Sequence, residues 1–491
     1  MILGVDAGTS VVKTVAFSKT GEALAVASQP MRTVSPRPGW QEQDVSQVIA
    51  GVASTIREVT KQVPEPVEMV GITGQGDGVW LVDEEGQPVR PAILWSDARA
   101  SDILEGWLAD GTGEAVFRQT GNALFPGAAA PVLRALLRDE PDLLAKARTA
   151  AYCKDVILQQ LTGVRATDLS DASLPFLDVH RRVYDDSLLA RFGLSEVAHL
   201  LAPIEPSDRL WPLSARGAEL TGLPEGTPIH AGPFDLVATM IGAGASQLGD
   251  SLIVLGTTLG CSVVTDRVET SGDISGMTLC LDEPNRWLRV MPAMVGTPVI
   301  DWVVNLIGVT HAELDGLLME SAPGARGVLV VPLLALSGER APFVEPNARG
   351  WVRGLSLDAS RADVVRAFCE GIAYAARHCL EAAGSPSDPP VHVCGGGMRS
   401  RQMRQIVANV LGRPLLVARQ PEVGARGAAM AALDAAGVPF NRAEWTRPEL
   451  EVQPESSCRD VYAVGYRAYR DAVAAMREEL RRQPNQPHAV A

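Results

Sequence analysis

The chain opens with two apolar segments joined by a tight turn, and this arrangement constrains the fold more than any other feature. Residues 2–7 and 11–17 have strand-like composition, and Asp6 lies near the end of the first segment. The turn consists of Gly8, Thr9 and Ser10. No helical pattern follows it, whereas a Walker loop or a dinucleotide-binding fingerprint opens a helix. The sequence therefore predicts a β-hairpin at the start of the fold.

This hairpin turn carries the groups that a phosphate site needs. Short hydroxyl side chains and backbone N–H groups at a turn can bind phosphate oxygens, and a carboxylate such as Asp6 can hold a hydrated cation beside them. Lys13 can reach a phosphate oxygen, although a solvated strand lysine is an equally ordinary interpretation. The alternative for the whole segment is a plain hairpin, in which Gly8 and Thr9 only close the turn.

A second turn of the same kind lies near the middle of the chain. Apolar residues 251–255 enter it, and the apolar segment 259–264 leaves it. Its residues are Gly256, Thr257 and Thr258. Because internal repeats reveal the architecture of a chain, the two turns suggest two similar halves, each opened by one hairpin.

The length and composition bound the number of domains. A chain of 491 residues is too long for one hydrophobic core and suits two domains of about 200–250 residues. With 46% hydrophobic residues it can bury a large core, which excludes global disorder. We expect an N-terminal domain over residues 1–245 and a C-terminal domain over residues 246–482. A flexible tail rich in Pro and Gln is expected over residues 483–491.

The charge and the cysteines bear on partners and location. Forty-four basic and fifty-eight acidic residues give a net charge of −14, which argues against nucleic acid as a partner but not against a nucleotide. The seven cysteines include no C-x-x-C pair, so we expect buried free thiols in a reducing compartment rather than zinc or disulfides. With no signal segment and no apolar run long enough for a membrane, a cytoplasmic protein is expected.

The order of the expected elements indicates an α/β fold with a mixed sheet and outer helices. Residues 45–62 have helical spacing with apolar side chains on one face. Residues 67–73 form a strand that enters a glycine-rich loop. In the second half, a long helix over residues 361–383 precedes a strand at 391–394. That strand opens directly into Gly395, Gly396 and Gly397.

Several motifs, in one order, resemble the FGGY family of carbohydrate kinases and together span nearly the whole chain. In the first half they are DAGTS at residues 6–10, WSDAR at 95–99 and GPFD at 232–235. In the second half they are GTT at 256–258, GERAP at 338–342, EGIA at 370–373, GGG at 395–397 and GARGAA at 424–429. The resemblance implies two actin/hexokinase-like lobes of ribonuclease-H-like topology. ATP would lie in the cleft between them, with the sugar bound mainly by the first lobe.

The resemblance also implies roles for individual residues. Asp235 matches the family's catalytic aspartate, and a carboxylate there can accept the proton of the attacking hydroxyl; the alternative is a helix N-cap. Asp6 resembles the strand-end aspartate that acts on Mg²⁺. The phosphates of ATP would face the two turns, with Gly8, Thr9 and Ser10 on one side and Gly256, Thr257 and Thr258 on the other. Adenosine would lie against Gly395, Gly396 and Gly397.

Two other motifs have structural interpretations. Glu339 and Arg340 are expected to form a buried or interlobe ion pair and to take no part in catalysis. Gly424 and Gly427 are expected to allow close helix packing near the nucleotide.

The loop of Gln75, Gly76 and Asp77 aligns with the sugar-contacting loop of the family, and it departs from the xylulokinase pattern. Typical xylulokinases carry Met-His where this chain has Gly76 and Asp77. A carboxylate can accept two hydroxyl hydrogen bonds, so Asp77 suits an open-chain polyol and would repel an aldonate. The alternative is a turn-forming Asp between glycines. The loop looks more similar to L-xylulose and erythritol kinases than to glycerol kinases, and Asp97 and Arg99 either line the pocket or pair with each other.

The sequence thus predicts an ATP- and Mg²⁺-dependent kinase that phosphorylates a terminal hydroxyl of a xylulose-type pentulose or a short polyol, with Asp235 as general base. A glycerol- or gluconate-type kinase is the alternative within the family. A nucleotide-gated binding protein of the actin-like fold is the alternative from another class, although it would need neither Asp235 nor a polar sugar loop. A small-molecule substrate is the expected partner, and the family makes a homodimer a reasonable expectation.

Overall fold

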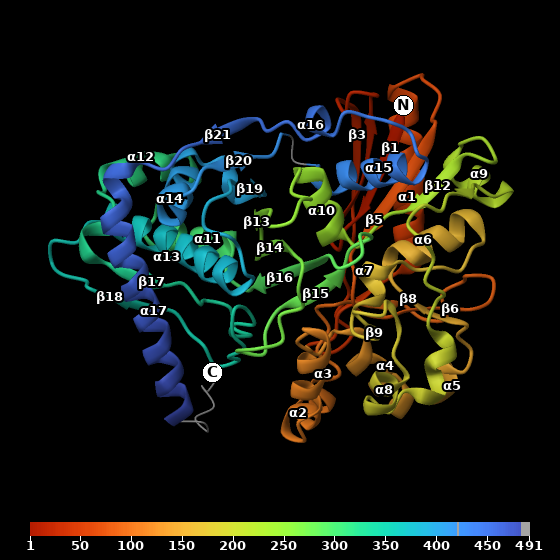
Figure 1. The fold of residues 1–491 in the computed structure, drawn as a ribbon, viewed down its shortest axis with the longest axis horizontal. Coiled ribbons are helices and arrows are strands. Elements are labelled where there is room, and N and C mark those ends of the chain that lie inside the picture. Colours follow the sequence, from red (N-terminus) through yellow and green to blue (C-terminus); the bar gives the residue numbers. More distant parts are fainter. Residues whose placement is uncertain (420–421, 483–491) are drawn as a thin grey trace.

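The computed structural model describes residues 1–419 and 422–482, and it has two lobes, each built on a mixed β-sheet (Figure 1). The first sheet has the strand order β11 (Trp211–Pro212), β12 (Pro228–Ala231), β5 (Met69–Gly74), β1 (Ile2–Ala7), β2 (Val11–Phe17) and β3 (Ala23–Pro30). The second has the order β15 (Met277–Cys280), β16 (Trp287–Ala293), β14 (Leu259–Thr265), β13 (Ser251–Leu255), β19 (Val391–Cys394), β20 (Leu415–Val417) and β21 (Leu450–Val452). The expected tail over residues 483–491 lies outside the described residues.

The remaining strands form short pairs around these sheets. They are β4 (Glu42–Gln43) with β7 (Ala92–Ile93), β6 (Trp80–Val82) with β8 (Thr149–Ala151), β9 (Leu177–Asp178) with β10 (Val183–Tyr184), and β17 (Leu329–Val331) with β18 (Trp351–Arg353).

Helices cover the sheets and fill the ends of the lobes. Those before residue 245 are α1 (Val45–Gln62), α2 (Ser101–Ala109), α3 (Thr112–Thr120), α4 (Ala129–Asp139), α5 (Pro141–Leu144), α6 (Cys153–Thr162), α7 (Leu169–Ala172), α8 (Asp186–Arg191), α9 (Ala215–Thr221) and α10 (Asp235–Ala243). Those after it are α11 (Thr297–Leu306), α12 (Leu314–Glu320), α13 (Arg361–Ala382), α14 (Arg401–Leu411), α15 (Val423–Ala435), α16 (Arg442–Trp445) and α17 (Arg459–Arg482). The helix expected over residues 45–62 is confirmed, and its apolar face, including Val48, Val52 and Ile56, is buried.

The two sheets share one topology, which confirms the expected repeat. In the first sheet β1 pairs antiparallel with β2 and parallel with β5, and β12 pairs parallel with β5 and antiparallel with β11. In the second sheet β13, β14, β19, β20 and β21 repeat these pairings in the same order. The expected two-lobed α/β class is therefore confirmed, and each lobe presents one hairpin turn at the carboxyl ends of its parallel strands.

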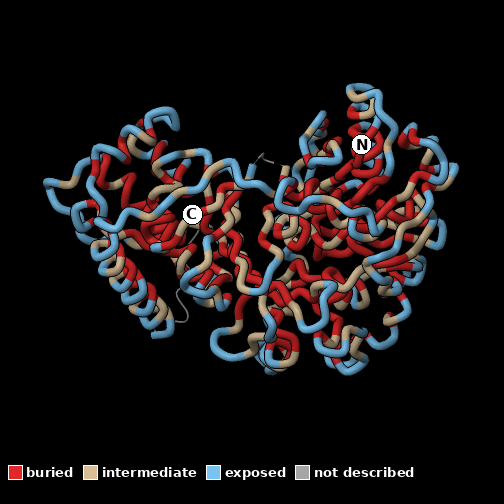
Figure 2. Tube along the Cα trace, turned by 45° about the horizontal axis from the view of Figure 1, so that its top comes forward, coloured by how far each residue is buried: buried red, intermediate tan, exposed pale blue. Residues whose placement is uncertain are grey.

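The lobes exchange one helix each. Helix α10 follows β12 of the first sheet, yet its Val237 and Met240 pack with Leu252 and Val290 of the second sheet. Helix α15 follows β20 of the second sheet, yet it packs with Ile2 and Val15 of the first. The two helices lie side by side between the lobes (Figure 1). Figure 2 shows that buried segments fill the centre of each lobe.

Glycines make the exchange possible because the backbones nearly touch. A Cβ on Gly4 would lie 1.9 Å from the carbonyl oxygen of Ala425, and a Cβ on Gly71 would lie 2.0 Å from that of Ala428. Where the exchanged helices cross, a Cβ on Gly427 would lie 1.8 Å from the carbonyl oxygen of Ala238. The packing role expected for Gly427 is thus confirmed.

All seven cysteines are buried free thiols. Within the described ranges, none of the helices is long and apolar enough to cross a membrane.

The tight contact between α15 and the first sheet yields a stability prediction. Gly71→Ala places a methyl group against backbone rather than against a movable side chain, so we expect the urea unfolding midpoint to fall by the equivalent of about 1–3 kcal/mol. Gly106→Ala is the matched control, because Gly106 lies inside α2 with open space around it and alanine favours helix by about 0.5–1 kcal/mol. Equal midpoints for the two variants would contradict this account of the packing.

Candidate active site

The two hairpin turns lie at the strand ends that face the cleft. Strand β1 ends at Ala7 beside the end of β5, and β13 ends at Leu255 beside the end of β19. The N–H of Gly8 donates to the carbonyl of Val11, and the N–H of Gly256 donates to the carbonyl of Thr258. Both turns are therefore closed by their own backbone, and Ser10 and Thr257 at their tips are exposed.

The side chain of Thr9 is committed to a hydrogen-bond network. Its Oγ1 donates to Oε1 of Gln75 at 2.7 Å and accepts from Nε1 of Trp95 at 3.0 Å. Gln75 in turn donates to Gln43 at 2.8 Å, and Gln43 donates to the carbonyl of Thr9 at 3.0 Å. The network ties the first turn to the loop expected to contact sugar, and the Ser10 hydroxyl takes no part in it.

Three carboxylates from separate elements meet at this edge of the first lobe. Burial raises the pKa of Asp6, at the end of β1, to about 6, and the charge of Lys13 opposes this shift. Burial raises the pKa of Asp77 to about 7, against the charge of Arg340. Burial also raises the pKa of Asp235 well above its usual range, and the charges of Asp6 and Asp77 add to the effect. A site that disfavours negative charge this strongly is suited to receive a cation or a proton.

Asp235 is the first residue of α10, and the N-cap position is held by Phe234. The alternative interpretation of Asp235 as the cap residue is therefore wrong. Its carboxylate accepts a hydrogen bond from the N–H of Leu236, and its side chain remains partly exposed.

Asp6 sits against the start of the exchanged helix α15. A Cβ on Gly424 would lie 2.5 Å from Oδ2 of Asp6, so any side chain there would displace the carboxylate. Gly424 thus has a packing role, as expected, and the group that it admits is Asp6. The N-terminal end of α15 also carries partial positive charge, which favours an anion at this point.

Asp77 is held in a strained backbone conformation and is 3% exposed. Its φ of 53° is uncommon outside glycine, although Asp tolerates it better than most residues, and such strain gathers at functional sites. The N–H of Ala129, at the start of α4, donates to the carboxylate, whereas Oδ1 has no partner in the described part of the chain. A Cβ on Gly76 would lie 2.2 Å from the ring of Phe234, so this glycine brings the loop against the turn that carries Asp235.

In the described part of the chain Glu339 and Arg340 form no direct salt bridge of the kind expected, although their charges act on each other. The Glu339 carboxylate accepts from the N–H groups of Met294 at 2.7 Å and of Arg340 at 2.9 Å. The guanidinium of Arg340 turns away, and its Nε donates to the carbonyl of Pro292 at 2.9 Å. Charge and motif identify both residues in the sequence, but only the fold shows which way each points.

Arg340 instead reaches across the cleft to the first lobe. Its guanidinium lies 5.4 Å from the ring centre of Trp95 and 5.5 Å from that of Phe125, within the range of cation–π attraction. Its charge also acts on Asp77. Arg340 therefore links the second lobe to Trp95, Phe125 and Asp77 of the first, a contact that the sequence interpretation missed.

Asp97 and Arg99 pair with each other, as one of the two alternatives predicted. Nε of Arg99 donates to Asp97 at 2.9 Å, and Nη2 donates to Glu42 at 2.7 Å. The guanidinium also stacks 3.9 Å from the ring centre of Trp40. These contacts fix the loop before α1 against the Trp95 turn.

The glycines after β19 bring their loop against the second hairpin. Gly395 has a φ of 99°, and a Cβ there would lie 2.5 Å from the carbonyl oxygen of Leu255. A Cβ on Gly397 would meet the Leu255 side chain at the same distance, whereas Gly396 faces open space. The loop therefore offers bare backbone beside the turn of residues 256–258.

A buried ionic cluster beneath the site is the main feature that the sequence interpretation missed. The ammonium of Lys154, which is fully buried, lies 2.6 Å from Asp155, 2.8 Å from Asp168 and 3.0 Å from Asp171. A Cβ on Gly76 would lie 2.9 Å from Oδ1 of Asp171, so the cluster underlies the sugar loop. The sequence contains a signal for an ionic cluster, since Lys154 is adjacent to Asp155 and Asp168 is close to Asp171. It contains no signal for the position of the cluster, because all four residues are far from Gly76 in the sequence.

Comparison with known proteins identifies the family. Residues 1–242 match the N-terminal domain of the FGGY family of carbohydrate kinases, and residues 251–436 match its C-terminal domain. The chain belongs to the FGGY family of carbohydrate kinases. The expectation of an ATP-dependent sugar kinase with a xylulokinase-like fold is thereby confirmed, with ATP as phosphate donor.

Individual relatives of this FGGY kinase act on different substrates. An erythritol kinase of Brucella abortus is 33% identical, with 97% of this chain and 96% of the relative covered. A xylulose kinase of Escherichia coli is 30% identical, with 89% and 90% covered. Among solved structures, a xylulose kinase from Rhodospirillum rubrum has a TM-score of 0.89 at 28% identity, covering 98% of this chain and 99% of that one.

The raised pKa of Asp77 predicts a pH-dependent stability. The ligand-free folded protein holds this proton more tightly than the unfolded chain does, because the pKa rises from 3.8 to about 7. This contribution of Asp77 to the free energy of unfolding is fully present at pH values below the pKa of Asp77 in the unfolded chain. It is lost as the pH rises through the pKa of Asp77 in the folded protein. Neutral Asp77→Asn escapes this loss, so its stability relative to the wild type should grow by on the order of 2–4 kcal/mol from about pH 5 to about pH 8.

Urea unfolding midpoints of the two proteins, measured without ligand across this pH range, provide the test. A constant offset between Asp77→Asn and the wild type at every pH would contradict the assignment.

Proposed function

We propose that this FGGY kinase transfers the γ-phosphoryl group of ATP to a terminal hydroxyl of a pentulose or short polyol, with Asp235 as general base. The observation that carries the proposal is that Asp235 lies within range of the charges of both Asp6 and Asp77, in a fold whose two lobes each present a Gly-Thr turn at a strand end. A sugar hydroxyl is a weak nucleophile, so phosphoryl transfer needs a base within reach and charge neutralisation around the phosphates.

The raised pKa of Asp235 supports its role. Once ionised, a carboxylate whose charged form is disfavoured by burial and by the charges of Asp6 and Asp77 takes up a proton more readily, which is the step required as the hydroxyl attacks. Partial exposure leaves the group accessible from the cleft. The hydroxyl proton passes to Asp235 while the sugar oxygen forms its bond to phosphorus and the bond to ADP breaks.

The donor set suits a nucleotide with Mg²⁺. Mg²⁺ is usually held by one or two carboxylates together with phosphate oxygens and waters, and Asp6 supplies such a carboxylate. Across the described ranges, no cluster of three His, Cys, Asp or Glu side chains has metal-binding geometry, which agrees with this sparse type of site. Mg²⁺ would neutralise charge that develops on the phosphates. Backbone N–H groups of Thr9, Ser10, Thr257 and Thr258 would bind phosphates beside Gly8 and Gly256, whose own N–H groups close the two turns. Gly396 would face adenosine.

The sugar pocket favours neutral, hydroxyl-rich ligands. Oδ1 of Asp77 is a buried acceptor without a partner, and filling it with a hydroxyl donor removes an energetic cost. Trp95 and Phe125 offer apolar ring surface nearby, under the guanidinium of Arg340. Erythritol and xylulose, for which two of the relatives are named, are ligands of this kind. A gluconate-type kinase remains the second candidate, since Arg340 places a positive charge beside Asp77.

A panel of acceptors tests the substrate class. ADP release by the wild type is expected to rise on addition of pentuloses or tetritols, and to rise less with glycerol or aldonates, because Asp77 accepts hydroxyl protons and repels carboxylates. A coupled ADP assay with Mg²⁺ and ATP provides the measurement. Stimulation by an aldonate above all others would favour the gluconate-type alternative, and no stimulation by any sugar would overturn the kinase proposal.

The base is tested separately. Asp235→Asn keeps the size of the side chain but cannot accept the proton, so kcat should fall by about 10²–10⁴-fold. Nucleotide affinity, measured by calorimetry, should change little. Asp142→Asn is the control, because Asp142 is an exposed carboxylate in the first turn of α5, outside the strand ends and turns of this site. Full turnover in Asp235→Asn would show that another group accepts the proton.

A further inference from the structure

We propose that Ser170 is a positioning residue that holds the backbone turn of the catalytic base, Asp235. The inference rests on the function proposed for Asp235. Ser170 lies in the short helix α7, 65 positions before the base in sequence, and nothing in its local sequence marks it as part of the reaction.

The turn that carries Asp235 is fastened on two sides. On one side, the hydroxyl of Thr73 in β5 donates to the carbonyl of Pro233 at 2.6 Å. On the other side, the N–H of Phe234 donates to Oγ of Ser170 at 2.9 Å. Phe234 immediately precedes Asp235 and is not helical, with φ of −43° and ψ of 145°. The residue that aims the base into the cleft is therefore held by side chains from two other elements.

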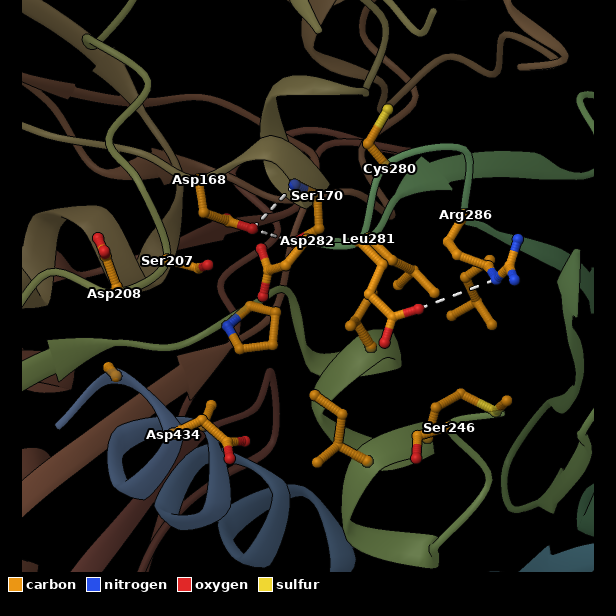
Figure 3. A pocket seen from close by; sticks show the side chains of 18 of the residues that line it. Asp168, Ser170, Ser207, Asp208, Ser246, Cys280, Leu281, Asp282, Arg286 and Asp434 are labelled. Atoms are coloured by element: carbon orange, nitrogen blue, oxygen red, sulfur yellow. Dashed lines mark hydrogen bonds and ion pairs between the residues drawn. The ribbon is translucent and has the colours of Figure 1, made fainter. Parts of the chain in front are cut away.

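The direction of the Ser170 hydrogen bonds is fixed. Its Oγ donates its only proton to Asp168, and the N–H of Ser170 donates to the same carboxylate at 2.8 Å (Figure 3). Oγ therefore has only lone pairs left for the Phe234 N–H. The charge of Lys154, 2.8 Å away, keeps the pKa of Asp168 below its usual range, so that this carboxylate remains an acceptor.

The same cluster also supports the sugar loop. Asp171, one residue after Ser170, pairs with Lys154 and lies against Gly76. The ring of Phe234 fills the space that the missing side chain of Gly76 leaves. One buried ammonium thus anchors both the loop that bears Asp77 and the turn that bears Asp235, and it fixes their separation.

Ser170 also lines a cavity, so the experiment must distinguish positioning of the Asp235 turn from a role of Ser170 within that cavity. This cavity of about 440 Å³ lies between the lobes and is lined by Asp168, Ser170, Ser207 and Asp282 among others (Figure 3). The bonds to Asp168 and Phe234 already engage the Ser170 hydroxyl as donor and acceptor. Ser207 also lines this cavity but interacts with Asp282 instead of the turn that carries Asp235, which makes it a matched control.

The experiment compares Ser170→Ala, Ser170→Thr and Ser207→Ala with the wild type. Loss of the acceptor for Phe234 frees the turn, and misplacement of a reacting group by about 1 Å can cost 10²-fold in rate, so kcat for sugar phosphorylation in Ser170→Ala should fall about 10- to 100-fold. ATP hydrolysis without sugar, which does not use the aimed base, and the KM for ATP should stay within about twofold. Ser170→Thr keeps the hydroxyl and should recover most of kcat, and Ser207→Ala should match the wild type.

Each possible result either supports or contradicts the positioning role of Ser170. Unchanged kcat in Ser170→Ala overturns the proposal, and so does a parallel loss of sugar phosphorylation and sugar-independent hydrolysis, because that pattern marks general structural damage. An equal loss in Ser207→Ala would assign the effect to the cavity instead. A wild type without sugar-stimulated turnover overturns the proposed function itself, whereas an active wild type with an unaffected Ser170→Ala overturns only the positioning role.

Discussion

The close backbone contact of the two exchanged helices is the constraint on which the rest of the molecule depends. Helix α10 and helix α15 each leave the lobe whose strand precedes them and pack on the other sheet. Gly427 and Gly242 permit the crossing, since a Cβ on either would lie 2.0 Å or less from a backbone carbonyl oxygen. The two helices run antiparallel, because a Cβ on Gly242, near the end of α10, would meet Val423 at the start of α15. A Cβ on Gly424 would lie near both Thr239 of α10 and Asp6, so the contact that joins the lobes also ties α10 to the end of β1.

The site contains carboxylates whose ionised form is destabilised by burial, and the surrounding backbone holds these carboxylates in fixed positions. Asp6, Asp77 and Asp235 all have raised pKa values because they lie out of water near other negative charges. Isolated charges would relax toward solvent or become neutral. Here a strand end, a strained loop and a turn held by Thr73 and Ser170 keep them in place, and Oδ1 of Asp77 has no hydrogen-bond partner in the described part of the chain.

The sequence was sufficient where local pattern decides structure. The two Gly-Thr turns, the helix over residues 45–62 and the repeated halves follow from apolar periodicity and turn chemistry, which act over a few residues. The motif order was sufficient for the family. It was insufficient for side-chain partners: Thr9 is committed to Gln75 and Trp95, and Arg340 faces Trp95 rather than Glu339. Those contacts join residues tens to hundreds of positions apart, and no local pattern encodes them.

The sequence by itself determined that this chain is a two-lobed FGGY kinase with a hairpin turn in each half. Only the tertiary structure decided that the pKa values of Asp6, Asp77 and Asp235 are raised, because a pKa depends on burial and on neighbouring charges that folding creates. It also showed that a buried lysine with three aspartates underlies the sugar loop and, through Ser170, the turn of Asp235. A hydrogen bond between residues 64 positions apart exists only when packing fixes both of them in place.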